Sequence, residues 1–246
     1  MQCTQSSKYD LAAKLRTRRS PFAVLSVVLF ASCMQATDPG LEERYTVEFS
    51  SPASVVGKRF SWPAMPVKIK YNPCQVSGCS AEIENSVRKG LDFWRRNASL
   101  YGEIQTVYSD SADIEVKYQT TLGGNTIGVC SADVGQYSNG QSVLVRPLTL
   151  TIATTYSGGT IKQSEFEFVA AHELGHCLGL WEHSPRDGDL MYYLLTDKTG
   201  YTARDLNSIR WLYSQTPQVG IYPAMAVGNE ITLTGEIAVS PELQRP

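Results

Sequence analysis

The three histidines of this 246-residue chain, His172, His176 and His183, all lie within twelve residues of one another. His172 and His176 are four residues apart, so on a helix their imidazoles lie one turn apart on the same face and can reach one ion. Glu173 follows the first histidine, where its carboxylate can approach a water molecule at the ion without binding the ion. This H-E-x-x-H spacing is typical of zinc hydrolases. We favour a metal site over two histidines that merely lie on a helix surface.

Residues 164–179 are expected to form the helix that carries these side chains. Ser164 and Glu167 have the spacing of a capping box, which would begin the helix. Gly179 is a natural left-handed terminator and would end it. A stripe of Phe166, Ala170, Leu174 and Cys177 would pack into the core beside the stripe of histidines.

Other parts of the chain show the alternation of strands or the periodicity of helices. A second capping box, Thr202 to Asp205, begins the last expected helix. Pro147 lies inside an expected strand and therefore predicts either an edge position or a bulge there. The expected strands are residues 63–71, 113–118, 126–130 and 143–152, and the further helices are residues 80–94 and 202–213.

The first 33 residues have the pattern of an export signal. A group of lysines and arginines precedes an apolar run, residues 22–30, that is too short to span a bilayer core of about 30 Å. The sequence Phe-Ala-Ser-Cys at residues 30–33 resembles the lipobox of bacterial lipoproteins, in which the cysteine, here Cys33, carries lipid. The alternative is an ordinary cleaved signal with an incidental cysteine. Residues 34–58 are polar and are interpreted as a tether or short pro-segment.

Export places the remaining cysteines in an oxidising compartment, where disulfides form. Cys74, Cys79, Cys130 and Cys177 allow three pairings. Cys74 and Cys79 bracket a short loop that could close locally and leave Cys130 with Cys177. Buried free thiols are the alternative. The formal net charge of −2 shows no basic surplus, so we expect no nucleic-acid partner.

The motif around the histidines resembles that of the metzincin clan and, within it, the matrixin-like metalloproteases. The family motif is H-E-x-x-H-x-x-G-x-x-H followed by a Met-turn, and His172, Glu173, His176 and Gly179 match it position for position. The resemblance covers residues 59–215. It implies an α+β metzincin (zincin-like) fold, in which a twisted mixed β-sheet accompanies an active-site helix and a C-terminal helix. It also implies one catalytic Zn²⁺ and protein or peptide substrates.

The third ligand position departs from the family spacing by one residue. Strict counting from Gly179 puts Glu182 there, whereas counting back eight residues from Met191 puts His183 there. A loop beyond the helix end can absorb one extra residue. Because imidazole is the ligand that the rest of the motif predicts, we favour His183 and keep Glu182 as the alternative.

The resemblance also assigns roles in a reaction. A zinc-activated water would attack the peptide carbonyl, with Glu173 as general base. Met191 would form the hydrophobic floor under the ligands. Tyr193 is a candidate donor to the oxyanion, as in astacin-like relatives, although a role in the specificity loop or core is the alternative. Residues 192–201 and an edge strand at residues 126–131 would select the substrate.

These features together predict an exported zinc endopeptidase that acts as a monomer. It would be a lipoprotein of the bacterial outer membrane or cell surface if Cys33 is lipidated, and periplasmic or secreted otherwise. The alternative function is a catalytically silent surface-binding lipoprotein of the same fold. Calcium is a second candidate ion, but no spaced acidic loop supports it. The tail, residues 216–246, contains a candidate short strand at residues 230–234 and receives no role.

Overall fold

The computed structural model describes residues 43–50, 53–98, 105–223, 231–238 and 243–244. The expected signal at residues 1–33, Cys33 with it, and the first part of the expected tether lie outside the described residues. The helices are α1 (Ala81–Ala98), α2 (Phe166–Cys177) and α3 (Ala203–Ser214), with a 3₁₀ turn, η2 (Gln163–Glu165), before α2. The strands are β1 (Val67–Tyr71), β2 (Thr106–Tyr108), β3 (Ile114–Gln119), β4 (Gly128–Tyr137), β5 (Ser142–Ala153), β6 (Thr155–Tyr156), β7 (Gly159–Thr160), β8 (Gly220–Pro223) and β9 (Ile231–Ala238).

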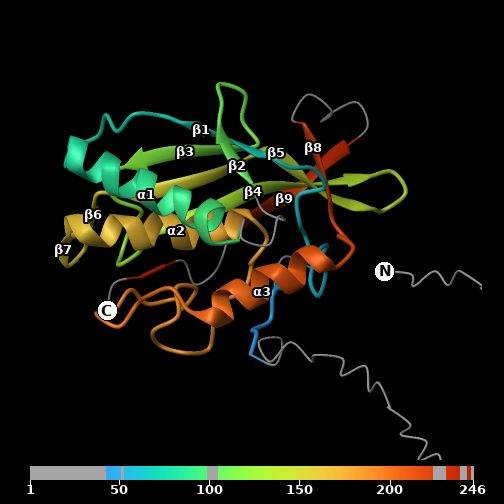
Figure 1. Ribbon diagram of the computed structural model, residues 1–246. Coiled ribbons are helices and arrows are strands. Elements are labelled where there is room, and N and C mark those ends of the chain that lie inside the picture. The colour runs from blue at the N-terminus through green and yellow to red at the C-terminus, as the bar shows by residue number, and fades with distance from the viewer. Residues whose placement is uncertain (1–42, 51–52, 99–104, 224–230, 239–242, 245–246) are drawn as a thin grey trace, which may run out of the picture. The chain divides into compact units, whose positions relative to one another are not determined.

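Seven strands form one mixed sheet in the order β2-β1-β3-β5-β4-β9, with β8 also paired to β5 (Figure 1). Strands β1, β2, β3, β5 and β8 pair in parallel, whereas β4 is antiparallel to both β5 and β9. The long central strand β5 is buried over most of its length, as a strand covered on both faces should be. The expected α+β fold with a mixed sheet is therefore confirmed.

Helices α1 and α2 lie side by side on the sheet (Figure 1), and α2 packs on β4 and β5. The two helices approach closely at Gly90, where a Cβ atom would lie only 2.2 Å from the carbonyl oxygen of Glu167. Ten of the twelve residues of α2 are buried, including both of its histidines and Glu173. A helix buried on all sides is positioned by its neighbours over its whole surface, which suits the element that carries the reactive side chains.

The structure corrects the expected start of α2. Ser164 and Glu167 form no capping box; instead η2 precedes the helix, and Glu165 accepts a hydrogen bond from the backbone N–H of Lys162. The expected stop at Gly179 is confirmed, since its φ is +116° and a Cβ atom there would lie 2.3 Å from the carbonyl oxygen of Phe60. The capping box of α3, Thr202 to Asp205, is also confirmed.

Strand boundaries differ from expectation in two places. The first strand covers only Val67–Tyr71 of the expected residues 63–71, and β4 (Gly128–Tyr137) extends seven residues beyond the expected end at residue 130. Pro147 does not lie at an edge, because β5 is central in the sheet. It lies within a bulge: Ser131 pairs with Thr149 and Asp133 with Val145, so the extra residues, Pro147 among them, are on β5. The bulge is the outcome that lets a proline stay in a central strand, since its missing N–H needs no partner there.

The described part of residues 34–58 packs onto the domain instead of hanging free as a tether. Four of its apolar side chains are buried, and Phe49 stacks on Trp181 with 4.9 Å between the ring centroids. Tyr45 donates its hydroxyl to Asp205 and its backbone N–H to Ser208, both on α3. The four buried residues are Tyr45, Val47, Phe49 and Val55. This arm therefore contributes to the core, whereas its removal as a pro-segment stays a prediction.

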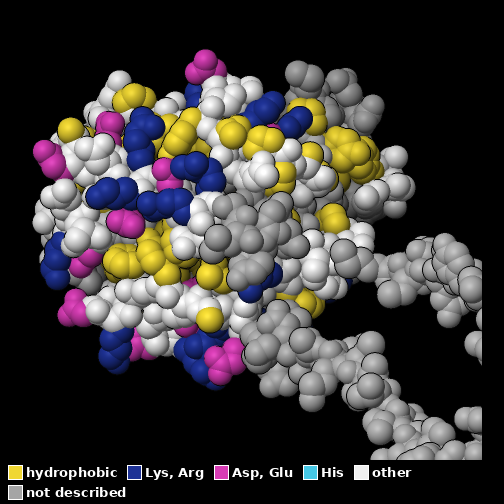
Figure 2. Space-filling view, in the orientation of Figure 1, with side chains coloured by type: hydrophobic (Ala, Val, Ile, Leu, Met, Phe, Trp, Pro, Cys, Tyr) yellow, Lys and Arg dark blue, Asp and Glu magenta, His cyan; other side chains and the backbone are white. Residues whose placement is uncertain are grey.

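The surface carries charges of both signs. Figure 2 shows Lys and Arg side chains interspersed with Asp and Glu over the face in view. No helix in the described part of the chain combines the length and apolar character needed to cross a bilayer.

Candidate metal centre

Helix α2 presents two imidazoles to one point. His172 and His176 are fully buried, and their Nε2 atoms lie 2.9 Å apart. Each ring is held from its other nitrogen: Nδ1 of His172 contacts the carbonyl oxygen of Leu190 at 2.7 Å, and Nδ1 of His176 contacts that of Leu180. Because a carbonyl can only accept, both Nδ1 atoms carry the proton, and both Nε2 lone pairs are left for a ligand.

The loop after α2 brings His183 to the same point. Its Nε2 lies 3.2 Å from that of His172 and 3.3 Å from that of His176. Gly179 makes this return possible, because the chain reverses there and the Leu180 N–H bonds back to the Gly175 carbonyl. Among the His, Cys, Asp and Glu side chains of the described residues, these three histidines form the one group whose ligand atoms all lie within 4.8 Å of one another. Glu182, the alternative ligand, is not in that group.

The donor set fits a zinc ion. Zinc holds imidazole nitrogens at about 2.0–2.1 Å in tetrahedral geometry, which places the nitrogens roughly 3.4 Å apart. The three observed separations, 2.9, 3.2 and 3.3 Å, approach that value. The backbone carbonyls on the Nδ1 atoms supply the outer hydrogen bonds that orient metal-binding histidines. Three histidines also leave a fourth position for water or substrate, as catalytic zinc sites require.

Burial keeps the imidazoles neutral. Desolvation holds the pKa of His172 and of His176 well below the ordinary value of 6.5, and the neighbouring histidines add to the effect. Burial also lowers the pKa of His183 to about 4. Neutral imidazole is the form that binds metal, so the apoprotein presents its ligands in the binding form near neutral pH.

Glu173 points from α2 towards the sheet. Its side chain is fully buried and lies against Gly128, the first residue of β4. A Cβ atom on Gly128 would lie 2.6 Å from Oε1 of Glu173, so only glycine leaves room for the carboxyl group in this position. The carboxyl of Glu173 is therefore held against the start of β4.

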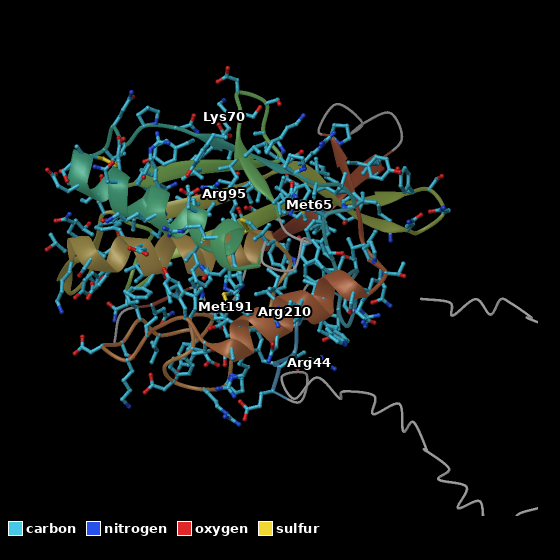
Figure 3. The ribbon with its side chains drawn as sticks, viewed as in Figure 1. Arg44, Met65, Lys70, Arg95, Met191 and Arg210 are labelled. Carbon is cyan, nitrogen blue, oxygen red and sulfur yellow. A yellow bond between two sulfur atoms is a disulfide. The ribbon has the colours of Figure 1, made fainter. Side chains whose placement is uncertain are left out.

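Met191 lies directly under α2, between α2 and α3 (Figure 3). A Cβ atom at Gly175 would lie 2.6 Å from the Met191 sulfur and 3.0 Å from the Trp94 ring, so Gly175 provides the space for both side chains. Gly175 lies between His172 and His176 on α2. Met191 therefore packs against the turn of α2 that carries both histidines, and its role as a floor under a bound metal stays a prediction.

A chain of hydrogen bonds ties this floor to α3. The carboxylate of Asp205 accepts the backbone N–H groups of Leu190, at 3.0 Å, and Met191, at 3.2 Å. The carbonyl oxygen of Leu190 in turn accepts the hydrogen bond from Nδ1 of His172. Next to it, Asp189 accepts two hydrogen bonds from the guanidinium of Arg204 and one from the hydroxyl of Ser184. Sequence reasoning identified Asp205 as a helix cap only and missed Asp189. The cap position of Asp205, close after a Met-turn, was the one signal that could have found this link.

Tyr193 lies next to His183. The two ring centroids are 6.3 Å apart and the rings meet edge to face, and the tyrosine is partly exposed. Tyr193 thus borders the histidine cluster, two residues beyond Met191, where a hydroxyl can approach a bound substrate.

Two disulfides brace the domain, and one of them reaches the site. Cys130 of β4 is bonded to Cys177, the residue after His176, and Cys74 is bonded to Cys79. The pairing is the one that closes the short loop locally. The Cys130–Cys177 bond joins the last turn of α2 to the strand on which Glu173 rests.

Comparison with known families agrees with this arrangement. The sequence model of the matrixin family matches residues 62–214, well over half of the chain. The matched stretch begins before β1 and ends at the last residue of α3. No curated protein matches the chain.

Proposed function

The chain belongs to the matrixin family of zinc metallopeptidases, and from this premise we propose that it is an exported zinc endopeptidase in which His172, His176 and His183 hold the ion and Glu173 is the general base. The observation that carries the proposal is the convergence of the three Nε2 atoms at one point, two of them from the helix that also carries the buried carboxyl of Glu173. When bound, zinc would lower the pKa of a water molecule to about 7 and polarise the substrate carbonyl.

Glu173 would take the proton from the attacking water and pass it to the departing amine. Its contact with Gly128 holds the carboxyl in one place, and the burial of α2 excludes bulk water from it. A charge that develops beside this carboxyl is therefore poorly screened, which strengthens the proton transfer. Tyr193, at the border of the histidine cluster, would donate its hydroxyl to the oxyanion.

The substrate would be a protein or peptide in extended form. The start of β4 lies next to Glu173, and a strand edge binds extended chains through backbone hydrogen bonds. The loop after Met191, expected from sequence to select the substrate, lies near His183 through Tyr193.

Zinc analysis combined with peptide cleavage tests the proposal. Purified protein should carry one zinc ion per chain and cleave members of a broad peptide library. Glu173→Gln should retain zinc and lose turnover by about 10²–10⁴-fold, since the base is gone but the ligands remain. Glu167→Gln is the matched control, because Glu167 lies on the same helix, is not fully buried, and accepts a hydrogen bond from the hydroxyl of Tyr201.

Each failure has a distinct meaning. Absence of zinc, or full activity in Glu173→Gln, would reject the mechanism. One zinc per chain without cleavage of any library peptide would favour the catalytically silent binding protein instead. Export and lipidation are tested separately: Cys33→Ala should move the protein from the detergent phase to the aqueous phase of an extract, and an unchanged distribution would reject the lipid anchor.

A further inference from the structure

The outer edge of β4 is the strand edge nearest the candidate base. One side of β4 pairs with β5, and the other side pairs with β9 from Ser131 to Tyr137. Gly128 stands before that stretch, in contact with Glu173. A segment that pairs with the chain around residues 126–128 therefore lies beside the candidate catalytic carboxyl.

Residues 243–244 of this chain occupy that place. Thr126 pairs with Gln244 as an antiparallel bridge, and the Ile127 N–H donates to the Leu243 carbonyl at 2.9 Å. Leu243 is only 1% exposed, so its side chain is buried in an apolar site instead of facing solvent.

The loop after Met191 holds the other side of the same two residues. The Gln244 N–H donates to the Tyr193 carbonyl at 3.0 Å, and the Leu195 N–H donates to the Gln244 carbonyl at 2.9 Å. Leu194 and Gln244 form a parallel bridge. Gln244 is thus bound in extended form between the residues just before β4 and the loop. Its partner Thr126 is two residues before Gly128, which contacts Glu173, and its other partner Tyr193 contacts His183.

The segment continues the direction of β9 along the same edge. Ser131 pairs with Ala238, and Thr126 pairs with Gln244. The two pairs are five residues apart on the first segment and six apart on the tail, so residues 243–244 keep the antiparallel direction of β9 with a register shifted by one residue. Both described stretches of the tail beyond residue 230 therefore cover the outer edge of β4, the edge expected from sequence to receive substrate.

We propose that residues 243–244 are an internal pseudosubstrate: they occupy the peptide groove of the site and must leave before a substrate can bind. The inference rests on the proposed function, because it concerns how the same site is regulated. A substrate strand needs the Ile127 N–H, the Leu195 N–H and the Tyr193 carbonyl, and all three are already used. A tethered segment competes at high effective concentration. The apparent affinity for substrate is therefore the intrinsic affinity multiplied by the fraction of chains in which the groove is open.

Three variants of the full chain test this competition. The first ends at Ala238, which leaves β9 intact. The second, Leu243→Asp, places an unpaired charge in the apolar site and should release the segment. The third, Leu233→Asp, is the matched control, because Leu233 lies on β9 with 48% of its surface exposed. Circular dichroism and thermal unfolding establish that each variant is folded.

Peptide binding is measured with the zinc-loaded proteins in the Glu173→Gln background, so that nothing is cleaved. The probe is a fluorescent peptide of residues 239–246, followed by polarisation. The shortened chain and Leu243→Asp should bind it at least ten-fold more tightly than the full chain or Leu233→Asp. Equal binding by all four proteins would overturn the proposal. If the shortened chain does not fold, Leu243→Asp alone decides.

Hydrogen exchange provides a readout that requires neither zinc nor turnover. In the metal-free full chain the Ile127 and Leu195 amides should exchange slowly, and both should exchange at least ten-fold faster in Leu243→Asp. Unchanged exchange would overturn the inference while the proposed function stands. Faster exchange and tighter peptide binding, with no cleavage by any variant in the active background, would support the occupied groove and reject the endopeptidase.

Discussion

Glu173 of α2 rests against Gly128 of β4 so closely that a single added methyl group would displace it. The Cβ of an alanine at residue 128 would lie 2.6 Å from Oε1, 2.7 Å from Cγ and 2.9 Å from Cδ of Glu173. A contact between a helix and a strand thus sets the position of the candidate base, and the helix alone does not.

Gly128→Ala should therefore impair catalysis without removing the metal. The carboxyl must move, and a shift of about 1 Å in a reacting group can cost on the order of 10²-fold in rate. Zinc content should stay at the wild-type level, because the three atoms that the added Cβ would meet first all belong to Glu173 and not to a histidine. Steady-state kinetics with zinc analysis measures both effects. Gly220→Ala is the control, since the added Cβ would meet only ordinary contacts from 3.4 Å outwards; wild-type turnover in Gly128→Ala would contradict the prediction.

The third ligand can be assigned by two parallel substitutions. His183→Ala should lower zinc affinity by more than about 100-fold, because the His183 Nε2 completes the cluster. Glu182→Ala should bind zinc as the wild type does. Competition with a fluorescent zinc chelator measures the affinities, and the reverse order would show that Glu182 closes the site.

Gly175→Ala should destabilise the domain by overfilling the space under the histidines. Its Cβ would press on the Met191 sulfur at 2.6 Å and on Trp94 at 3.0 Å, and overpacking typically costs about 1–3 kcal/mol. Met191→Ala creates the opposite defect, so the double variant should be more stable than the sum of the two single effects predicts. Urea unfolding measures the four free energies, and strict additivity would show that the two residues do not compete for space.

Acid should weaken the fold through Asp189. Burial alone would raise the pKa of this carboxyl, but the hydrogen bonds from Arg204 and Ser184 outweigh it and hold the pKa below the ordinary 3.8. A depressed carboxyl pKa contributes stability that is present above the ordinary value and is lost as pH falls through the folded value. The free energy of unfolding should therefore fall below about pH 4, and less steeply in Asp189→Asn than in the wild type. Asp197→Asn, the same substitution at an exposed site, controls for the change itself, and parallel curves for the wild type and Asp189→Asn would exclude Asp189 as a source of the acid sensitivity.

The two disulfides should differ in their contribution to stability. Cys130 and Cys177 are 47 residues apart in the chain, whereas Cys74 and Cys79 are 5 apart. Loop-closure entropy predicts a loss of about 4 kcal/mol for Cys130→Ala with Cys177→Ala, and about 2 kcal/mol for the other pair. Denaturant unfolding of the two double variants tests the order. An equal loss in both would show that chain entropy is not the main source of stabilisation.

Local spacing was enough to predict the centre of the site. The four-residue interval between His172 and His176, the neighbouring Glu173 and the terminator Gly179 all lie on one helix and its end, where backbone geometry alone decides which side chains share a face. The mixed α+β fold and the family also followed from these motifs and from strand periodicity.

The two main corrections have different causes. The start of α2 moved because of a local alternative: η2 precedes the helix, and Glu165 accepts the Lys162 N–H three residues away in place of the expected cap. The arm at Tyr45 packs on α3 although its composition is polar. That packing could not be predicted, since the arm gains its stability from partners more than a hundred residues away. The same reason hid Asp189 and Asp205, whose importance lies in the backbone that they hold.

The sequence by itself determined the family and the fold class, and it indicated the candidate metal ligands and the candidate base. Only the tertiary structure decided that His183 and not Glu182 joins the cluster, that Gly128 makes room for Glu173, and that Gln244 lies between Thr126 and the loop after Met191. Local helix geometry encodes the first set within a few residues. The second set depends on burial and hydrogen bonds between segments that meet only after the chain has folded.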